Sequence, residues 1–136
     1  MNLYFIAVPF ILFASMKTKE RMIFDTTPDF EKDLKSLKKK YRTLDDDLGV
    51  FKSALKVDPR NLVGVVRIPL GEKIKPEVFK ARKFRCKSLR GKGSKSGIRV
   101  IYAYIPEENK VIFVEIYHKR NKSNHDIKRI EGYFKS

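Results

Sequence analysis

The stretch that decides the fold is Gly97-Ile-Arg-Val-Ile-Tyr-Ala-Tyr104, which lies in the most basic part of the chain. Its β-branched and tyrosine residues are typical of a β-strand, and residues 98–105 are predicted to form one. Residues 110–117 form a second run of this kind after a turn at 106–109. The two runs therefore predict an antiparallel hairpin.

Residues 78–86 precede this hairpin and predict a third strand, although their alternation is imperfect. Phe79 and Ala81 are expected on one side of it, and Phe84 and Cys86 on the other. In the run at 110–117, alternation is expected to separate Ile112, Val114 and Ile116 from Val111, Phe113 and Glu115.

The region around these strands is strongly basic. Residues 78–106 contain nine Lys or Arg and no Asp or Glu, and the 136-residue chain has a formal net charge of +15. Residues 78–136 hold 16 basic and 5 acidic residues, whereas residues 1–77 hold 15 and 11. A basic sheet with aromatic residues between the cations is typical of a protein that binds nucleic acid. The alternative is a basic surface that is only solvated.

The sequence argues against several classes of site. Cys86 is the single cysteine, so no internal disulfide can form. There is no CxxC motif, no HExxH motif and no Asp-rich calcium loop, so no metal site is expected. There is neither a GxGxxG nor a Walker-type loop, and no cofactor is expected.

The N-terminal segment 3–14 is an apolar run that is too short to cross a bilayer unaided. It lacks the cationic start of a signal peptide. Met16 and Met22 could each start translation, and we expect residues 1–21 to be an extension outside a single domain of residues 22–136. A cytoplasmic protein without membrane contact is therefore expected, and secretion or anchoring by this segment is the alternative.

Two amphipathic helices are expected before the basic region, after a short strand at 22–26. The first begins at Thr27, a preferred N-cap residue, with Pro28 at its first position. The second begins at Thr43 and ends at Asp58, which precedes a proline. Apolar residues recur at helical spacing in both helices: Phe30, Leu34, Leu37 and Tyr41, then Leu44, Leu48, Phe51 and Leu55.

The remaining segments complete the predicted fold. Residues 45–47 are three aspartates in the first turn of the second helix, where the helix dipole favours anions. Residues 60–77 are expected to pack on the domain, with a short strand, and a final helix is predicted from residues 123–126 onward. The predicted fold class is α+β: a small antiparallel sheet of about four strands, an N-terminal helical hairpin packed on it, and a short C-terminal helix.

Three motifs in the basic region resemble a known family. They are Lys80-Ala-Arg82, the run Arg90-Gly-Lys-Gly-Ser-Lys-Ser-Gly-Ile-Arg-Val-Ile-Tyr102, and residues 111–117 followed by His118-Lys119-Arg120. In this order they resemble the RelE/ParE superfamily of type II toxins, over residues 22–136.

The resemblance implies an activity and partners. The RelE branch cleaves messenger RNA on the ribosome without a metal, because the substrate's own 2′-hydroxyl attacks the adjacent phosphate. The ParE branch inhibits DNA gyrase and cuts no RNA. In both branches the family implies an acidic antitoxin that folds over the basic sheet.

The resemblance also implies roles for individual residues. Arg99 matches the arginine of the family's Gly-x-Arg strand and is expected to stabilise charge in the transition state. Lys80 and Arg82 fall on the strand that carries active-site lysines in the family. Lys119 and Arg120 match a pair that holds phosphate.

The family's catalytic tyrosine, six residues after the arginine of that pair, has no counterpart, because Asp126 occupies this position. The adjacent His125 is the expected acid–base substitute, with His118 as the second candidate. Residues 91–97 form a flexible connector or a phosphate-binding loop. Further RNA contacts are expected from the other cations of the region: Lys83, Arg85, Arg90, Lys92 and Lys95.

These residues also have structural interpretations. Arg99 could pair with Glu115 across the hairpin, Lys80 and Arg82 could be solvated, and His125 could cap a helix. Three tyrosines are expected mainly in the core, with stacking on nucleic-acid bases as the alternative: Tyr102, Tyr104 and Tyr117. For the whole chain, the alternatives to a nuclease are a gyrase inhibitor and a non-catalytic nucleic-acid-binding module.

Overall fold

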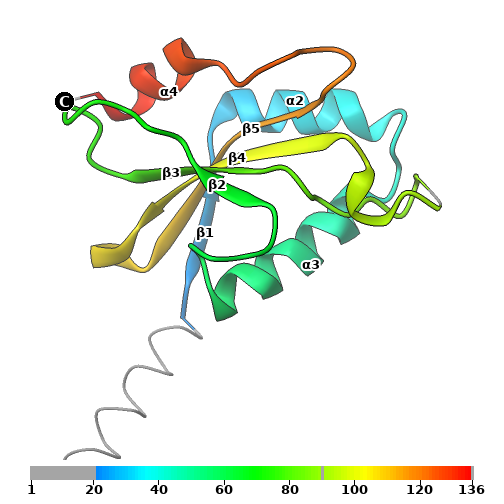
Figure 1. Ribbon diagram of the computed structural model, residues 1–136, viewed down its shortest axis with the longest axis horizontal. Coiled ribbons are helices and arrows are strands. Elements are labelled where there is room, and N and C mark those ends of the chain that lie inside the picture. Colours follow the sequence, from blue (N-terminus) through cyan, green and yellow to red (C-terminus); the bar gives the residue numbers. More distant parts are fainter. Residues whose placement is uncertain (1–20, 90, 136) are drawn as a thin grey trace, which may run out of the picture.

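The computed structural model describes residues 21–89 and 91–135 (Figure 1). Its centre is a five-stranded sheet in the order β1-β5-β4-β3-β2. The strands are β1 (Ile23–Thr26), β2 (Val65–Arg67), β3 (Glu77–Ala81), β4 (Ile98–Ile105) and β5 (Lys110–His118). The helices are α2 (Pro28–Lys38), α3 (Leu44–Val57) and α4 (Ile127–Phe134), with short 3₁₀ turns η1 (Gly93–Lys95) and η2 (Pro106–Glu108). The predicted α+β class, with its helical hairpin and C-terminal helix, is confirmed.

The extension expected at residues 1–21 lies outside the described residues, apart from Arg21. Among the helices formed by residues 21–89 and 91–135, none has the length and apolar character needed to cross a membrane.

The sheet has two apolar faces. α2 and α3 pack on one face and bury Phe30, Leu34, Leu44, Leu48 and Leu55. α4 packs on the other face through Ile130 and Phe134. Each buried leucine or phenylalanine contributes roughly 1.5–3 kcal/mol to folding. The helical stripes expected from the sequence are therefore the core of the domain.

The edge strand β1 differs in direction from the expected antiparallel sheet. It runs parallel to β5, with Ile23 opposite Lys110 and Thr26 opposite Phe113. The chain then turns directly into α2, where the Thr27 hydroxyl accepts a hydrogen bond from the Phe30 amide at 3.1 Å, as expected of an N-cap. The fifth strand is β2, the short strand expected within residues 60–77, and it closes the other edge.

Asp47 does more than place a negative charge in the first turn of α3, because it also joins α3 to another segment of the chain. The predicted side-chain cap by Thr43 is absent, and the Thr43 hydroxyl instead donates to Asp47 Oδ2 at 2.8 Å. The buried carboxylate also accepts the Lys87 amide at 3.2 Å. Asp47 therefore ties α3 to the segment that follows β3.

The third predicted strand is shorter than residues 78–86. β3 ends at Ala81, and the chain then leaves the sheet. Phe84 and Cys86 consequently pack in the same core as Phe79 and Ala81, and the prediction that they face the other side is wrong. Strand alternation cannot continue once the ladder has ended.

A β-bulge in β5 changes which side chains face which side of the sheet. Ile101 is opposite Glu115, and Tyr102 is opposite Phe113, so Val114 is an extra residue. The predicted alternation of this strand is therefore wrong beyond Val114. Glu115 lies on the face that carries α4, and the bulge places the side chain of Tyr117 on the same face.

Gly97, at the start of β4, is required by its surroundings. Its φ is +83°, and a Cβ there would lie 2.8 Å from His118 Nε2. We expect Gly97→Ala to lower the free energy of unfolding by about 1–3 kcal/mol, measured by chemical denaturation. Gly49 in α3 is the matched control, because nothing lies within 4 Å of an added Cβ there. Gly49→Ala should raise stability by about 0.5–1 kcal/mol, and equal effects at the two sites would contradict this account.

Candidate active site

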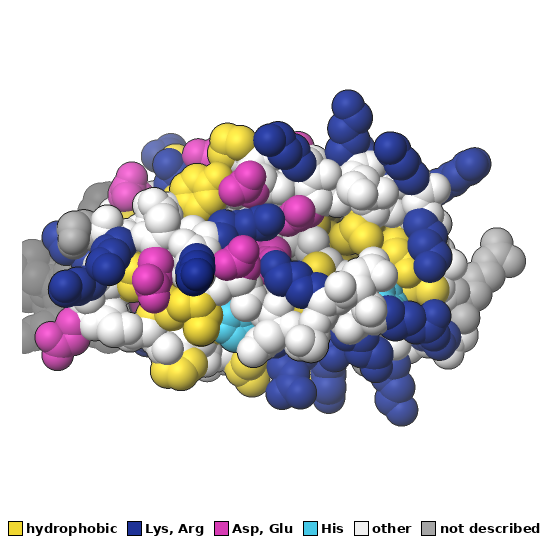
Figure 2. Space-filling view, turned by 90° about the horizontal axis from the view of Figure 1, so that it is seen from above, with side chains coloured by type: hydrophobic (Ala, Val, Ile, Leu, Met, Phe, Trp, Pro, Cys, Tyr) yellow, Lys and Arg dark blue, Asp and Glu magenta, His cyan; other side chains and the backbone are white. Residues whose placement is uncertain are grey.

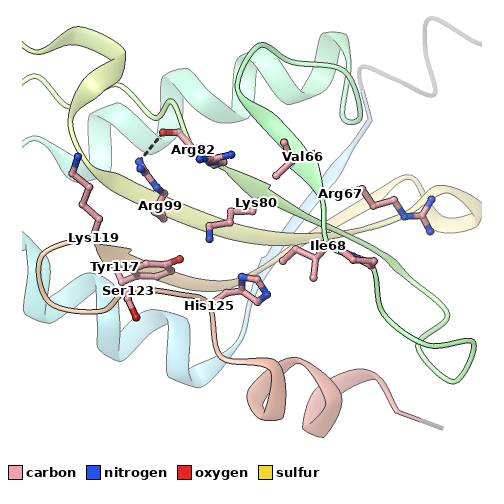
Figure 3. Close-up of a pocket in the computed structure, with 11 residues that line it drawn as sticks. Val66, Arg67, Ile68, Lys80, Arg82, Arg99, Tyr117, Lys119, Ser123 and His125 are labelled. Atoms are coloured by element: carbon pink, nitrogen blue, oxygen red, sulfur yellow. Dashed lines mark hydrogen bonds between the residues drawn. The ribbon is translucent and has the colours of Figure 1, made fainter.

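A cationic cavity of about 400 Å³ lies on the sheet face that also carries α4 (Figure 3). All four residues predicted to be catalytic line it: Lys80, Arg82, Arg99 and His125. Lys80 on β3, Arg99 on β4 and Tyr117 on β5 share this face because strand side chains alternate and the bulge resets β5. The remaining lining residues are Val66, Arg67, Ile68, Pro69, Lys119 and Ser123.

Arg99 is held by the backbone and not by a carboxylate. Its Nη1 donates to the Arg82 carbonyl oxygen at 2.7 Å. Its cross-strand neighbour is Tyr117, whereas Glu115 is opposite Ile101. Among the described residues no carboxylate forms an ion pair with Arg99, so the alternative pairing with Glu115 does not form. The remaining N–H groups of the guanidinium are therefore available to a ligand.

Lys80 lies in the middle of the cavity. Its Nζ donates to Asn124 Oδ1 at 3.1 Å. Burial lowers its pKa, the charges of Arg82 and Arg99 lower it further, and Glu115 opposes them. A lysine in this setting gives up its proton more readily than a free lysine does.

His125 reaches the cavity from the loop before α4. Its backbone amide donates to Asn124 Oδ1 at 3.0 Å, so the same amide oxygen contacts Lys80 and His125. Burial lowers the pKa of His125, and the positive charges of Lys80 and Lys122 lower it further. The negative charge of Glu115 raises it but does not outweigh these effects. The imidazole is therefore neutral at physiological pH, as a proton acceptor must be.

Glu115 holds the loop that carries His125. Its side chain is 1% exposed, forms an ion pair with Lys122 and accepts the Asp126 amide at 2.9 Å. These contacts fasten both ends of the segment 122–126 to β5. No sequence motif predicted this role, although a glutamate in an otherwise apolar strand is a signal for it.

Tyr117 lines the cavity, although no motif of the sequence assigned it to the site. Its ring is buried, as expected. The pKa of Tyr117 is raised to about 12, chiefly by burial and also by the charge of Glu115, against the opposing charge of Arg99. The hydroxyl is therefore neutral and keeps its proton.

His118 lies on the opposite face of the sheet, so it cannot serve as the second acid–base candidate of this cavity. Its ring stacks on Tyr41 at a centroid distance of 5.8 Å. Nε2 lies 3.0 Å from the Ser96 carbonyl oxygen, and Nδ1 accepts the Arg120 amide at 3.0 Å. Both ring nitrogens therefore have a structural role.

His118 predicts a loss of stability in mild acid. Burial lowers the pKa of His118, although its hydrogen bond with Ser96 has the opposite effect. In mild acid the unfolded chain therefore binds a proton at His118 more readily than the folded chain does. Stability should fall as pH decreases below the unfolded value of about 6.5. We expect His118→Gln to reduce the slope of unfolding free energy against pH between about pH 7 and pH 5.

His125 adds to the same slope, because its pKa is lowered too. His125→Gln should therefore reduce the slope as well, and the double variant should reduce it most. A parent slope of zero, or an opposite sign, would contradict this prediction.

The other predicted RNA-binding residues are distributed more widely. Lys83, Lys95 and Lys119 line a second hollow of about 430 Å³ beside the first, together with Arg82 and Arg99. Arg85 instead lines an apolar groove beside α3, together with Val50 and Phe51. Lys92 and Arg120 are exposed and line neither hollow, and Arg90 is outside the described residues. Figure 2 shows Lys and Arg side chains crowded around the right-hand half of the face it draws.

The charge around the cavity suits a phosphate group. Its lining includes Lys80, Arg82, Arg99 and Lys119 and contains no carboxylate. Arginine can hold phosphate through two parallel hydrogen bonds, and it keeps its charge at every physiological pH. Within residues 21–89 and 91–135, no group of three His, Cys, Asp or Glu side chains could hold a metal ion.

Comparisons with known proteins give similarity in structure alone. No family model matches the chain, and no curated protein matches it. A chain of the archaeal RelE–RelB complex from Pyrococcus horikoshii OT3 is 18% identical, with a TM-score of 0.47 over 71% of this chain and 93% of that chain. A mutant of the E. coli toxin RelE in the free state is also 18% identical, with a TM-score of 0.45 over 75% of this chain and 87% of that chain.

Proposed function

We propose that this chain is the toxin of a type II toxin–antitoxin system and a metal-independent endoribonuclease that cleaves messenger RNA on the ribosome. The observation that carries the proposal is the convergence of Lys80, Arg82, Arg99 and His125 on one cavity without a carboxylate. They come from three separate segments of the chain, since Lys80 and Arg82 share one motif, and each was assigned to the site from the sequence.

The proposed reaction is transfer at phosphorus within the RNA. The 2′-oxygen forms a bond to the adjacent phosphorus while the bond from phosphorus to the 5′-oxygen breaks, which leaves a cyclic phosphate and a 5′-hydroxyl. Neutral His125 accepts the proton of the 2′-hydroxyl, and protonated Lys80 donates a proton to the leaving 5′-oxygen. Arg99 and Arg82 bind the non-bridging oxygens, where negative charge grows in the transition state.

The proposed partners follow from charge. Contacts to phosphate dominate affinity for RNA, so binding should weaken steeply with salt. An acidic antitoxin would cover the cationic face and prevent RNA from entering, and its charge would speed its association. The P. horikoshii structure is a complex of RelE with RelB, and a comparable partner is proposed for this chain.

The test is induced expression of the full chain, with mapping of new 5′ ends on cellular mRNA. The parent should produce cuts in phase with codons, and the double variant Lys80→Ala, Arg99→Ala should produce none. A control with Lys32→Ala and Lys35→Ala removes the same charge from exposed positions on α2 and should cut as the parent does. Growth arrest without mRNA cuts, with signs of DNA damage, would instead indicate gyrase as the target.

One observation favours a non-catalytic nucleic-acid-binding module as the second candidate. Asp126, at the position of the family's tyrosine, caps α4 by accepting the Arg129 amide at 3.0 Å. The position is thus occupied by a structural residue. This candidate predicts salt-sensitive RNA binding with neither cleavage nor growth arrest.

A further inference from the structure

Two buried polar atoms have no hydrogen-bond partner among the described residues: Tyr117 Oη and His125 Nδ1. Both residues line the cationic cavity. A buried polar atom without a partner costs about 1–3 kcal/mol, and native proteins contain few of them. Two such atoms in one cavity indicate a ligand that supplies the missing hydrogen bonds.

The cavity has two chemically different ends (Figure 3). Arg82, Arg99 and Lys119 lie at one end. Ile68 and His125 lie at the other, with Lys80 between the two ends. The Tyr117 ring lies beside Arg99, its cross-strand partner, and its hydroxyl points toward Lys80. Val66 and Pro69, close to Ile68 in the chain, add apolar surface to the lining, and Val66 also borders the second hollow. Beside Ile68 the cavity therefore offers apolar surface together with the neutral imidazole of His125.

Arg67 also borders the apolar end, but its guanidinium is directed away from it. Its Nη1 lies 3.8 Å from Glu77 Oε1. In Figure 3 its side chain extends away from His125 and Tyr117. The apolar end is therefore suited to a neutral group, next to a cationic end that is suited to phosphate.

We propose that the apolar end is a subsite for one nucleobase, whose own phosphate is bound by Arg82, Arg99 and Lys119. The inference rests on the proposed function in taking RNA as the source of that nucleotide. The flat faces of a base pack against Val66 and Ile68, while its polar edge meets Tyr117 Oη and His125 Nδ1. A ribose, which is ringed by hydroxyl groups, gains nothing from the apolar wall.

The subsite makes an unusual prediction about Tyr117→Phe. Because its hydroxyl has no partner among the described residues, removing it should leave the free energy of unfolding unchanged or raise it. The same change should weaken nucleotide binding. A purely structural tyrosine would show the opposite pair of effects.

The experiment is titration of the full chain with three kinds of probe: inorganic phosphate, ribose 5-phosphate and the four nucleoside 5′-monophosphates. Binding is followed by NMR or calorimetry at constant ionic strength. At least one nucleotide should bind about fivefold or more tightly than ribose 5-phosphate. Tyr117→Phe should reduce this nucleotide's affinity about five- to tenfold and leave the affinity for phosphate unchanged.

Tyr133→Phe is the matched control, because its hydroxyl lies outside the cavity, 3.3 Å from Asp29. It should alter neither affinity. Equal affinities for phosphate, ribose 5-phosphate and all four nucleotides would overturn the subsite, as would a nucleotide preference that Tyr117→Phe leaves intact. If ribose 5-phosphate binds more tightly than phosphate and as tightly as every nucleotide, the cavity recognises the sugar, and this result would also overturn the nucleobase subsite.

These outcomes are separate from those of the cleavage experiment, because no probe contains a cleavable internucleotide bond. Nucleotide selectivity that depends on Tyr117, without mRNA cuts in cells, would uphold the subsite and reject the nuclease. Codon-phased cuts without such selectivity would uphold the nuclease and reject the subsite.

Discussion

Arg99→Ala should reduce the rate of mRNA cleavage about 10²- to 10³-fold, which is the usual loss when a donor to a developing oxyanion is removed. The guanidinium is fixed by its hydrogen bond to the Arg82 carbonyl and has no carboxylate partner among the described residues, so it is oriented before substrate arrives. The rate is measured under single-turnover conditions on mRNA bound to ribosomes.

Arg99→Lys distinguishes charge from geometry. Lysine keeps the positive charge but lacks the planar pair of N–H donors, so it should restore part of the activity and not all of it. Circular dichroism should show both variants folded, because Arg99 is partly exposed and makes one backbone hydrogen bond. Cleavage by Arg99→Ala at the parent's rate would remove Arg99 from the catalytic site.

Glu115→Gln should change both stability and the pH dependence of cleavage. The glutamine can still accept the Asp126 amide, but it leaves Lys122 without its charged partner. Because the Lys122 side chain is 36% exposed, it can turn to solvent, and the expected loss is about 1.5–3 kcal/mol. Glu115→Ala should lose more, since it also leaves the Asp126 amide unpaired. Both losses are measured by chemical denaturation.

The pH profile of Glu115→Gln should move to lower pH. The Glu115 charge raises the pKa values of Lys80 and His125, so its removal lowers both. A general base with a lower pKa is already deprotonated, and therefore active, at lower pH. A general acid with a lower pKa loses its proton, and therefore its activity, at lower pH as well. The exposed Glu107, in η2, supplies the control, since Glu107→Gln removes the same charge far from the loop. An unshifted profile in Glu115→Gln would mean that Lys80 and His125 do not govern the rate.

Much of this fold could be predicted from local sequence. The Thr27 cap, the stripes of both helices and the β4–β5 hairpin are each specified by residues close together in the chain. The candidate site was also predicted, because the motifs that contain Lys80 and Arg99 identify residues that the sheet brings together.

Other features could not be read from local patterns. The sequence does not reveal that β1 pairs in parallel with β5, since pairing direction depends on where the intervening chain crosses the sheet. It does not reveal the end of β3 at Ala81 either, because Phe84 returns to the core only after the chain has left the ladder.

By itself the sequence determined most of the elements, the basic region and the cations of the candidate site, because periodicity and charge are local properties. Only the tertiary structure decided that Glu115 and Tyr117 lie on the same face of the sheet as those cations. The bulge at Val114 shifts β5 by one residue, and in a strand with a two-residue period this moves every later side chain to the opposite face. That shift places Tyr117 in the cavity and His118 against Tyr41, an outcome that depends on the register of two strands and not on either strand alone.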